Sequence, residues 1–172
     1  VIWLIEAGKL ADAILLLRRL TDIICCSISR DDFGVLREDI GSYIYMLRRG
    51  SKDEGVRLLN MVIDSIRDAL RGHRGDKRKF KEGLEALVKV GWWCGSHAPE
   101  VVRRIIKIME ENGGIGKCAR MLSNEMKRRF LITLETVDPV LGARVLEEIG
   151  PGTQMEDSIL KELISRGRSR EA

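Results

Sequence analysis

The sequence predicts an all-α protein of about eight helices arranged as antiparallel pairs. Apolar residues recur at steps of three and four along most of the chain, and the two-residue alternation typical of strands is nearly absent. A phrase of one arginine followed by two apolar residues begins at Arg57, Arg104 and Arg144. The spacings between these starts, about 47 and 40 residues, are typical of stacked two-helix repeats.

The first two predicted helices lie in residues 9–28 and in the stretch that follows Asp31 and Asp32. In residues 9–28 the apolar positions form one continuous helical face, made of Leu10, Ala13, Ile14, Leu17, Leu20, Ile24 and Ile28. Asp31 and Asp32 are residue types that favour the N-cap, so we expect the second helix to begin there. This helix would end at Gly50.

A third and a fourth helix are predicted on either side of a basic loop. Ser51 favours an N-cap, and Glu54 stands three residues later at the spacing of a capping box, so a helix should run from here to Gly72. Residues 72–79 are the most polar and basic stretch of the chain, which indicates an exposed loop. The fourth helix is expected over residues 76–92.

The remaining predicted helices occupy the second half of the chain. Pro99 is placed where a first-turn proline is tolerated, and the helix that it opens should stop at residues 112–114. Another helix is expected over residues 115–136, and the pair Asp138-Pro139 opens the next. A last short helix is predicted over residues 155–165, followed by a polar tail at residues 166–172.

A second marker repeats with nearly the same period as the arginine phrase. Phe33, Phe80 and Phe130 lie about 47 and 50 residues apart, in segments that alternate with those bearing the phrase. A fourth copy of the phrase, without its arginine, can be placed at Ala13-Ile14-Leu15. Two markers with one period favour a repeated helical pair.

Two stretches resemble the turn and second-helix start of HEAT repeats. They are Asp53-Glu54-Gly55-Val56-Arg57 and Pro99-Glu100-Val101-Val102-Arg103, in which an acidic or proline-containing turn leads to Val-Arg. Asp138-Pro139-Val140-Leu141 shares the turn, but Gly142 stands where the pattern has arginine. The resemblance to HEAT and armadillo-like repeat proteins implies a short right-handed α–α superhelix. The alternative is an irregular helical bundle, in which helices of similar length produce such matches by chance.

Length and composition indicate one globular domain. The chain has 172 residues, of which 44% are hydrophobic and 33% charged, which is too apolar for disorder. We therefore expect a single domain over residues 1–165 with the tail at residues 166–172. No apolar run approaches the roughly 20 residues that span a bilayer.

Targeting signals and cysteine usage favour the cytoplasm. Residues 1–5 are apolar but follow no basic segment, so a signal peptide is not expected. Without a secretion signal, the four cysteines are interpreted as reduced thiols. Scarce Asn and Gln beside abundant Arg and Glu give a thermophile-like composition.

Adjacent arginines are the most repeated charged feature. They occur as Arg18-Arg19, Arg48-Arg49, Arg103-Arg104 and Arg128-Arg129. In a stack of helices one member of each pair would face solvent, and together these could form a ladder suited to phosphate groups. The alternative is that the arginines are solvated or paired with acidic side chains of neighbouring helices.

The densest basic cluster defines the nucleic-acid hypothesis. Its members are Arg71, His73, Arg74, Lys77, Arg78, Lys79 and Lys81, with Asp76 as the only acid among them. Such a cluster attracts polyanions, and Phe80, Trp92 and Trp93 follow it as aromatic rings that could stack on bases. A solvated loop explains the charges equally well, with Phe80 in the core.

Catalytic and metal-binding patterns are weak, so we expect no enzyme, no cofactor and no metal. Cys94 and His97 have the spacing of half a zinc site, but no second closely spaced pair accompanies them. Residues 113–118 superficially resemble a phosphate-binding loop, yet neither serine nor threonine follows Lys117.

The sequence therefore predicts a non-enzymatic scaffold that binds another protein or a second copy of itself. The surface residues expected to contact such a partner are Arg48, Arg49, Trp92, Trp93, Arg104 and Arg128. A nucleic-acid-binding module that uses the basic cluster is the alternative. Neither membrane binding nor a small-molecule substrate is expected.

Overall fold

The computed structural model describes residues 1–149, which form nine helices and no strand. The helices are α1 (Ile2–Glu6), α2 (Leu10–Ser29), α3 (Val35–Arg49), α4 (Lys52–Gly72), α5 (Lys77–Cys94), α6 (Pro99–Glu111), α7 (Ile115–Met121), α8 (Asn124–Val137) and α9 (Pro139–Ile149). The all-α prediction is confirmed. Within the described part of the chain, no helix combines the length and the apolar character needed to cross a membrane.

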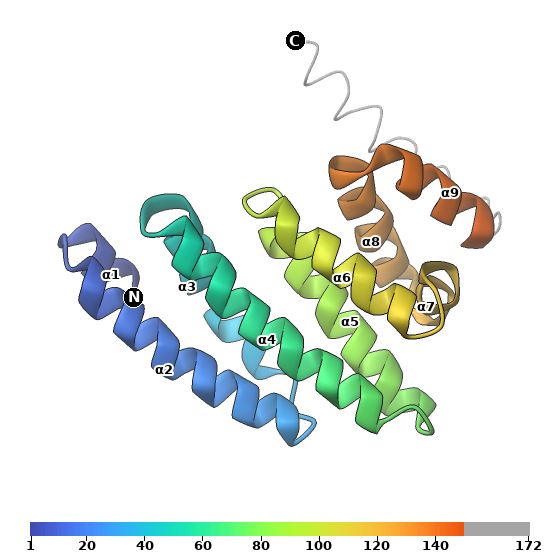
Figure 1. Cartoon of the computed structure of the whole chain (residues 1–172), viewed down its shortest axis with the longest axis horizontal. Coiled ribbons are helices and arrows are strands. Elements are labelled where there is room, and N and C mark those ends of the chain that lie inside the picture. Colours follow the sequence, from blue (N-terminus) through green and yellow to red (C-terminus); the bar gives the residue numbers. More distant parts are fainter. Residues whose placement is uncertain (150–172) are drawn as a thin grey trace, which may run out of the picture.

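The longer helices are arranged in two rows. In the first row α2, α4 and α6 lie side by side, with α4 packed between the other two (Figure 1). In the second row α5 packs between α3 and α8. The two sequence markers follow these rows in part. Arg57 and Arg104 lie in α4 and α6, and Phe80 and Phe130 lie in α5 and α8, whereas Phe33 precedes α3 and Arg144 lies in α9, outside both rows.

Local signals explain most helix starts. The Ser51 hydroxyl accepts a hydrogen bond from the Glu54 N–H at 3.3 Å, which satisfies one free donor at the start of α4. Asp76 caps α5 in the same way through the Lys79 N–H at 3.2 Å. Pro99 occupies the first turn of α6. The predicted starts of these three helices are confirmed to within a residue.

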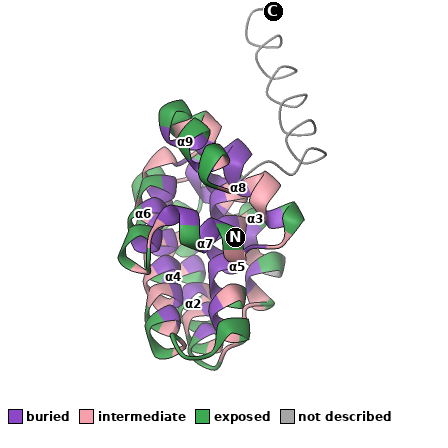
Figure 2. Cartoon of the chain, turned by 90° about the vertical axis from the view of Figure 1, so that its right-hand side faces the viewer, coloured by how far each residue is buried: buried purple, intermediate pink, exposed green. Residues whose placement is uncertain are grey.

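The core lies between the two rows and forms one apolar cluster. Figure 2 shows the buried residues on the sides of the helices that face one another, with the exposed residues outside. Thr21 on α2 and Tyr43 on α3 form a buried polar contact within this core, with 2.7 Å between their hydroxyl oxygens. Because the Thr21 hydroxyl donates to the Leu17 carbonyl at 2.7 Å, it accepts from Tyr43, and the hydroxyl groups of both residues are satisfied.

The predicted N-cap at Asp31 and Asp32 is wrong. Asp31 has a φ of 64°, in the left-handed region, and α3 begins only at Val35. The Asp32 carboxylate instead accepts from the Gly34 N–H at 3.1 Å, which closes a local turn. The Asp31 carboxylate points away to a neighbouring turn, so both side chains hold the connection rather than start the helix.

The predicted continuous helix over residues 115–136 is also wrong. Leu122 is extended, with ψ at 154°, and Ser123 caps a new helix, α8, by accepting from the Met126 N–H. The Glu85 carboxylate on α5 accepts from both the N–H and the hydroxyl of Ser123, at 3.2 and 2.9 Å. Side-chain contact with another helix therefore fixes this break.

Two further differences concern the ends of the chain. Residues 2–6 form the short helix α1, which the sequence did not predict. The predicted helix over residues 155–165 and the tail at residues 166–172 lie outside the described residues.

Candidate functional site

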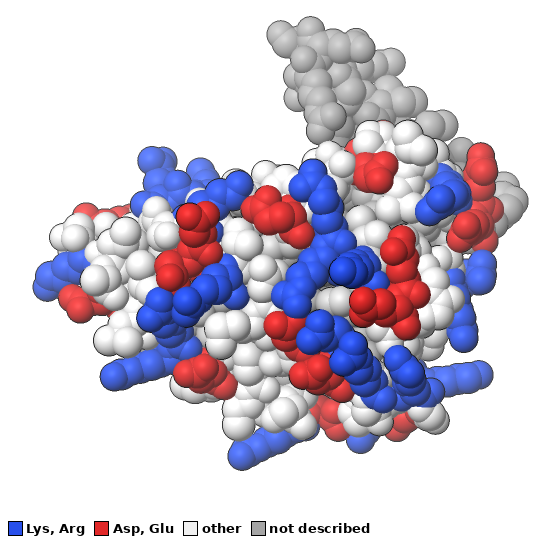
Figure 3. Space-filling view, viewed as in Figure 1, with Lys and Arg blue, Asp and Glu red and all other residues white. Residues whose placement is uncertain are grey.

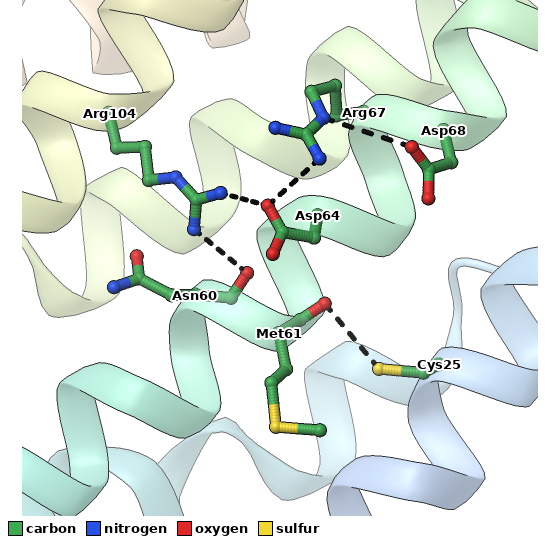
Figure 4. Close-up of polar contacts among 7 residues, drawn as sticks. All are labelled: Cys25, Asn60, Met61, Asp64, Arg67, Asp68 and Arg104. Carbon is green, nitrogen blue, oxygen red and sulfur yellow. Dashed lines mark hydrogen bonds and ion pairs between the residues drawn. The ribbon is translucent and has the colours of Figure 1, made fainter.

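Two arginines of the predicted pairs, Arg18 and Arg104, form ion pairs between neighbouring helices. Arg104 on α6 reaches α4, where it contacts the Asp64 carboxylate and donates to the Asn60 carbonyl at 3.2 Å (Figure 4). Arg67 lies 3.4 Å from the same carboxylate. On the other side of α4, Arg18 of α2 pairs with Glu54 at 3.1 Å. These cations connect the first row, and Arg104 is only partly accessible.

The other predicted arginines lie apart from this network. Arg48 and Arg49 are exposed on the last turn of α3. Arg128 and Arg129 on α8 both face Glu125, at 3.7 and 3.1 Å. The predicted contact residues are therefore spread over both rows, and their role in partner binding stays a prediction.

The tryptophan pair is half-buried. The Arg129 guanidinium lies 5.7 Å from the ring centre of Trp92, at the distance of a cation–π contact. Trp93 packs against the core and lines a groove of about 370 Å³ between α3 and α5, together with Arg37 and Lys89. The most exposed tryptophan is Trp3 on α1, at 69%, which the sequence prediction did not include.

The basic cluster is divided by the fold. Lys79 lies 3.2 Å from the Asp31 carboxylate, which also accepts a hydrogen bond from His73. These contacts, the His73 hydrogen bond first, lower the pKa of Asp31. Arg78 pairs with Glu82 at 3.5 Å along α5. His73, Lys79 and Arg78 of the basic cluster are therefore already paired with acidic side chains.

Arg74 and Lys77 face a cavity on the opposite side of the same turn. This cavity of about 390 Å³, here called the turn pocket, lies between the α4–α5 turn and the α6–α7 turn and is lined by Arg74, Lys77, Phe80, Glu111, Asn112, Gly113, Lys117 and Met121. Figure 3 shows Lys and Arg side chains over the ends of α4 and α6 and the start of α5, with Asp and Glu side chains among them, as over much of the remaining face.

Both turns that border the turn pocket are fixed by contacts outside it. The first is held to the α2–α3 connection through Asp31. In the second, the Cys118 thiol lies within hydrogen-bonding distance of the Met109 carbonyl (3.5 Å) and the Asn112 carbonyl (3.6 Å). The sequence could not reveal Lys117 as part of this site, because only the packing of α6 and α7 brings it beside Arg74 and Lys77.

The two buried cysteines, Cys94 and Cys118, are poorly suited to nucleophilic chemistry. Burial raises the pKa of the Cys94 thiol to about 12 and that of Cys118 to about 11, which disfavours the reactive thiolate. Across residues 1–149, no group of three His, Cys, Asp or Glu side chains is placed to hold a metal ion.

Exposed apolar side chains concentrate at the α1–α2 end of the molecule. Large hydrophobic residues that are exposed on these two helices are Ile2, Trp3, Leu10, Leu15, Leu16 and Ile23. Arg18 and Cys25 point toward α4, so helical geometry directs Leu16, Leu20 and Ile23 away from α4, although Leu20 is partly buried and also packs against the core. We call these three residues the end stripe. Leu16 and Ile23 are 39% and 58% exposed.

Comparisons with known proteins were made at the level of families, characterised sequences and solved structures. They identify no family. Neither a family model, nor a characterised protein, nor a solved structure matches the chain significantly.

Proposed function

We propose that the chain is a non-enzymatic helical scaffold that binds another protein through the end stripe on α2. The observation that supports this role most directly is the apolar character of that side of α2, where Ile23 is 58% exposed. Solvated helices at the ends of helical stacks usually carry a polar outer face, because the apolar surface would otherwise promote association. An end helix with an apolar outer face is expected where another helix packs against it.

The proposed occupant is a helix of a partner protein that continues the first row. On its inner side α2 packs along α4. The exposed Leu16 and Ile23, with the partly buried Leu20 between them, have the i, i+4, i+7 spacing of a second helix contact on the side away from α4. Arg19 and Arg30 border this side without an ion pair to any residue in the described range. An amphipathic helix with acidic residues beside its apolar stripe would complement both features.

The larger architecture that we propose is the right-handed HEAT-like superhelix implied by the sequence resemblance. The two rows and the repeated markers support it, and a row of this kind can be extended by a helix of another chain. For the end stripe a protein partner is preferred over a nucleic acid because the stripe is apolar, and Lys79 and Arg78 of the basic cluster already pair with Asp31 and Glu82.

A pair of matched leucine and isoleucine substitutions tests the proposal. Leu15 and Ile23 lie on the same helix and are 51% and 58% exposed, but only Ile23 belongs to the end stripe. A partner would be captured from an extract of the source organism, identified, purified, and titrated against the Ile23→Glu and Leu15→Glu variants. We expect Ile23→Glu to weaken binding by about tenfold or more and Leu15→Glu to have little effect.

Two results would contradict this role. Equal binding of both variants would place the partner elsewhere on the molecule. A concentration-dependent mass in sedimentation equilibrium that Ile23→Glu abolishes would identify the occupant as a second copy of the chain instead of another protein.

A further inference from the structure

We propose that the turn pocket binds a nucleoside phosphate, either as a free nucleotide or as one unit of a single-stranded nucleic acid. This ligand is independent of the protein partner proposed for the end stripe, because the turn pocket lies at the α4–α5 and α6–α7 turns and the end stripe on α2.

The charge of the turn pocket favours an anion. Arg74 in the α4–α5 turn, Lys77 at the start of α5 and Lys117 in α7 all line it, although they are distant in the sequence. Within the described range, none of these three cations takes part in an ion pair, and Glu111 is the only acid that lines the pocket. Their combined charge exceeds that of Glu111, and an arginine fork with two ammonium groups matches the oxygens of a phosphate.

The turn backbone positions one of these cations. Gly113 has a φ of 107°, in the region that favours glycine, and a Cβ atom there would lie 3.1 Å from Cδ of Lys117. The Lys117 side chain therefore runs back across the turn toward the pocket. A larger residue at position 113 would strain the backbone and displace this side chain.

The other walls of the turn pocket suit the base and the ribose of a nucleotide. The buried Phe80 ring and the half-buried Met121 give an apolar surface against which a base can pack. The Asn112 amide nitrogen donates to the Ile108 carbonyl at 2.7 Å, whereas the Asn112 Oδ1 is buried without a hydrogen-bond partner. A hydroxyl or amine of the ligand that reaches into this wall would satisfy the oxygen. The volume of about 390 Å³ lies within the usual range of ligand pockets.

Direct binding measurements on the whole chain test this site. The probes are ADP, inorganic phosphate and a short oligothymidylate, titrated at low salt by calorimetry. Arg74→Gln and Lys117→Met each remove one pocket charge while keeping much of the side-chain length. Arg103→Gln and Lys107→Met remove the same charges from exposed positions of α6 outside the pocket and serve as controls. Circular dichroism checks that all four variants are folded.

The expected result is that each pocket variant weakens binding of ADP or of the oligothymidylate by about tenfold, while the controls change it by less than about twofold. Binding of ADP would identify a free nucleotide, and binding of the oligothymidylate alone would identify a unit of nucleic acid. Three results would overturn the proposal: no binding of either probe, equal weakening by pocket and control variants, or inorganic phosphate binding as tightly as ADP.

Discussion

Asp31 determines how a whole turn is built, although it is a single residue outside any helix. Its left-handed backbone reverses the chain between α2 and α3, and its carboxylate holds His73 and Lys79 of the next turn. Aspartate tolerates this conformation better than most residues. The sequence suggested that Asp31 is an N-cap, because a carboxylate that accepts hydrogen bonds serves equally well to cap a helix and to hold a turn. Only its long-range partners distinguish them.

Replacing Asp31 by Asn should therefore destabilise the protein in a pH-dependent way. The lowered pKa of Asp31 means that the folded state favours the carboxylate, so its contribution is present above the ordinary pKa of 3.8 and is lost as the pH falls through the lower folded value. We expect the difference in melting temperature between wild type and Asp31→Asn to be largest at neutral pH and to shrink in acid. Asp22→Asn, an exposed position of α2, is the control; a pH-independent difference for Asp31→Asn would argue against the ion pairs.

The cysteines provide a second prediction at the residue scale. Burial raises the pKa values of Cys94 and Cys118, whereas the Cys26 side chain is exposed. Iodoacetamide at neutral pH should modify Cys26 at least about tenfold faster than either buried thiol, as peptide mass spectrometry would measure. Similar rates at Cys26 and Cys94 would show that the core opens readily.

At the scale of elements, the break between α7 and α8 shows how tertiary contacts override local preference. The apolar periodicity of residues 115–136 fits one helix, and the stretch contains no proline. The break occurs where Glu85 of α5 binds the N–H and the hydroxyl of Ser123. Ser123 was the one signal in the sequence for a helix break here, but a serine can be an N-cap or an ordinary helical residue, so it does not predict a break by itself.

Ser123→Ala should weaken this junction. The substitution removes the cap of α8 and the hydroxyl hydrogen bond to Glu85, and we expect a loss of about 1–2 kcal/mol in the free energy of unfolding. Urea denaturation measures this change. Ser96→Ala, at an exposed serine after α5, should leave stability within about 0.5 kcal/mol of wild type. Equal effects of the two substitutions would mean that the cap is not important.

At the scale of the whole molecule, the period of the repeated phrase predicted the fold class because its apolar residues are the ones that become buried. Leu58 and Leu59 are buried, as are Ile105 and Ile106, at the place where α4 and α6 meet the core. The apolar repeat thus predicted the class of fold and most helix positions. The turn pocket and the end stripe could not be predicted, since each depends on which sides of the helices remain uncovered after packing.

Substitutions at the apolar and the arginine positions of the repeated phrase should differ strongly in their cost to stability. Leu58→Ala would leave a cavity in the core and should cost about 2–5 kcal/mol. Arg57→Ala removes only an exposed ion pair to Glu54 at 3.8 Å and should change the free energy of unfolding by less than about 1 kcal/mol. Chemical denaturation of both variants measures the contrast, and a large cost at Arg57 would assign the arginine a structural role.

The buried hydroxyl pair of Thr21 and Tyr43 has a consequence for spectroscopy. Burial raises the pKa of Tyr43, and the hydrogen bond to Glu6 raises that of Tyr45. These are the two tyrosines of the chain, so the folded protein should develop less tyrosinate absorbance near the ordinary pKa of 10.0 than the unfolded chain does. Because the unfolded state ionises there first, stability falls as the pH rises further. Alkaline titration therefore follows the separation of α1, α2 and α3 without any added label.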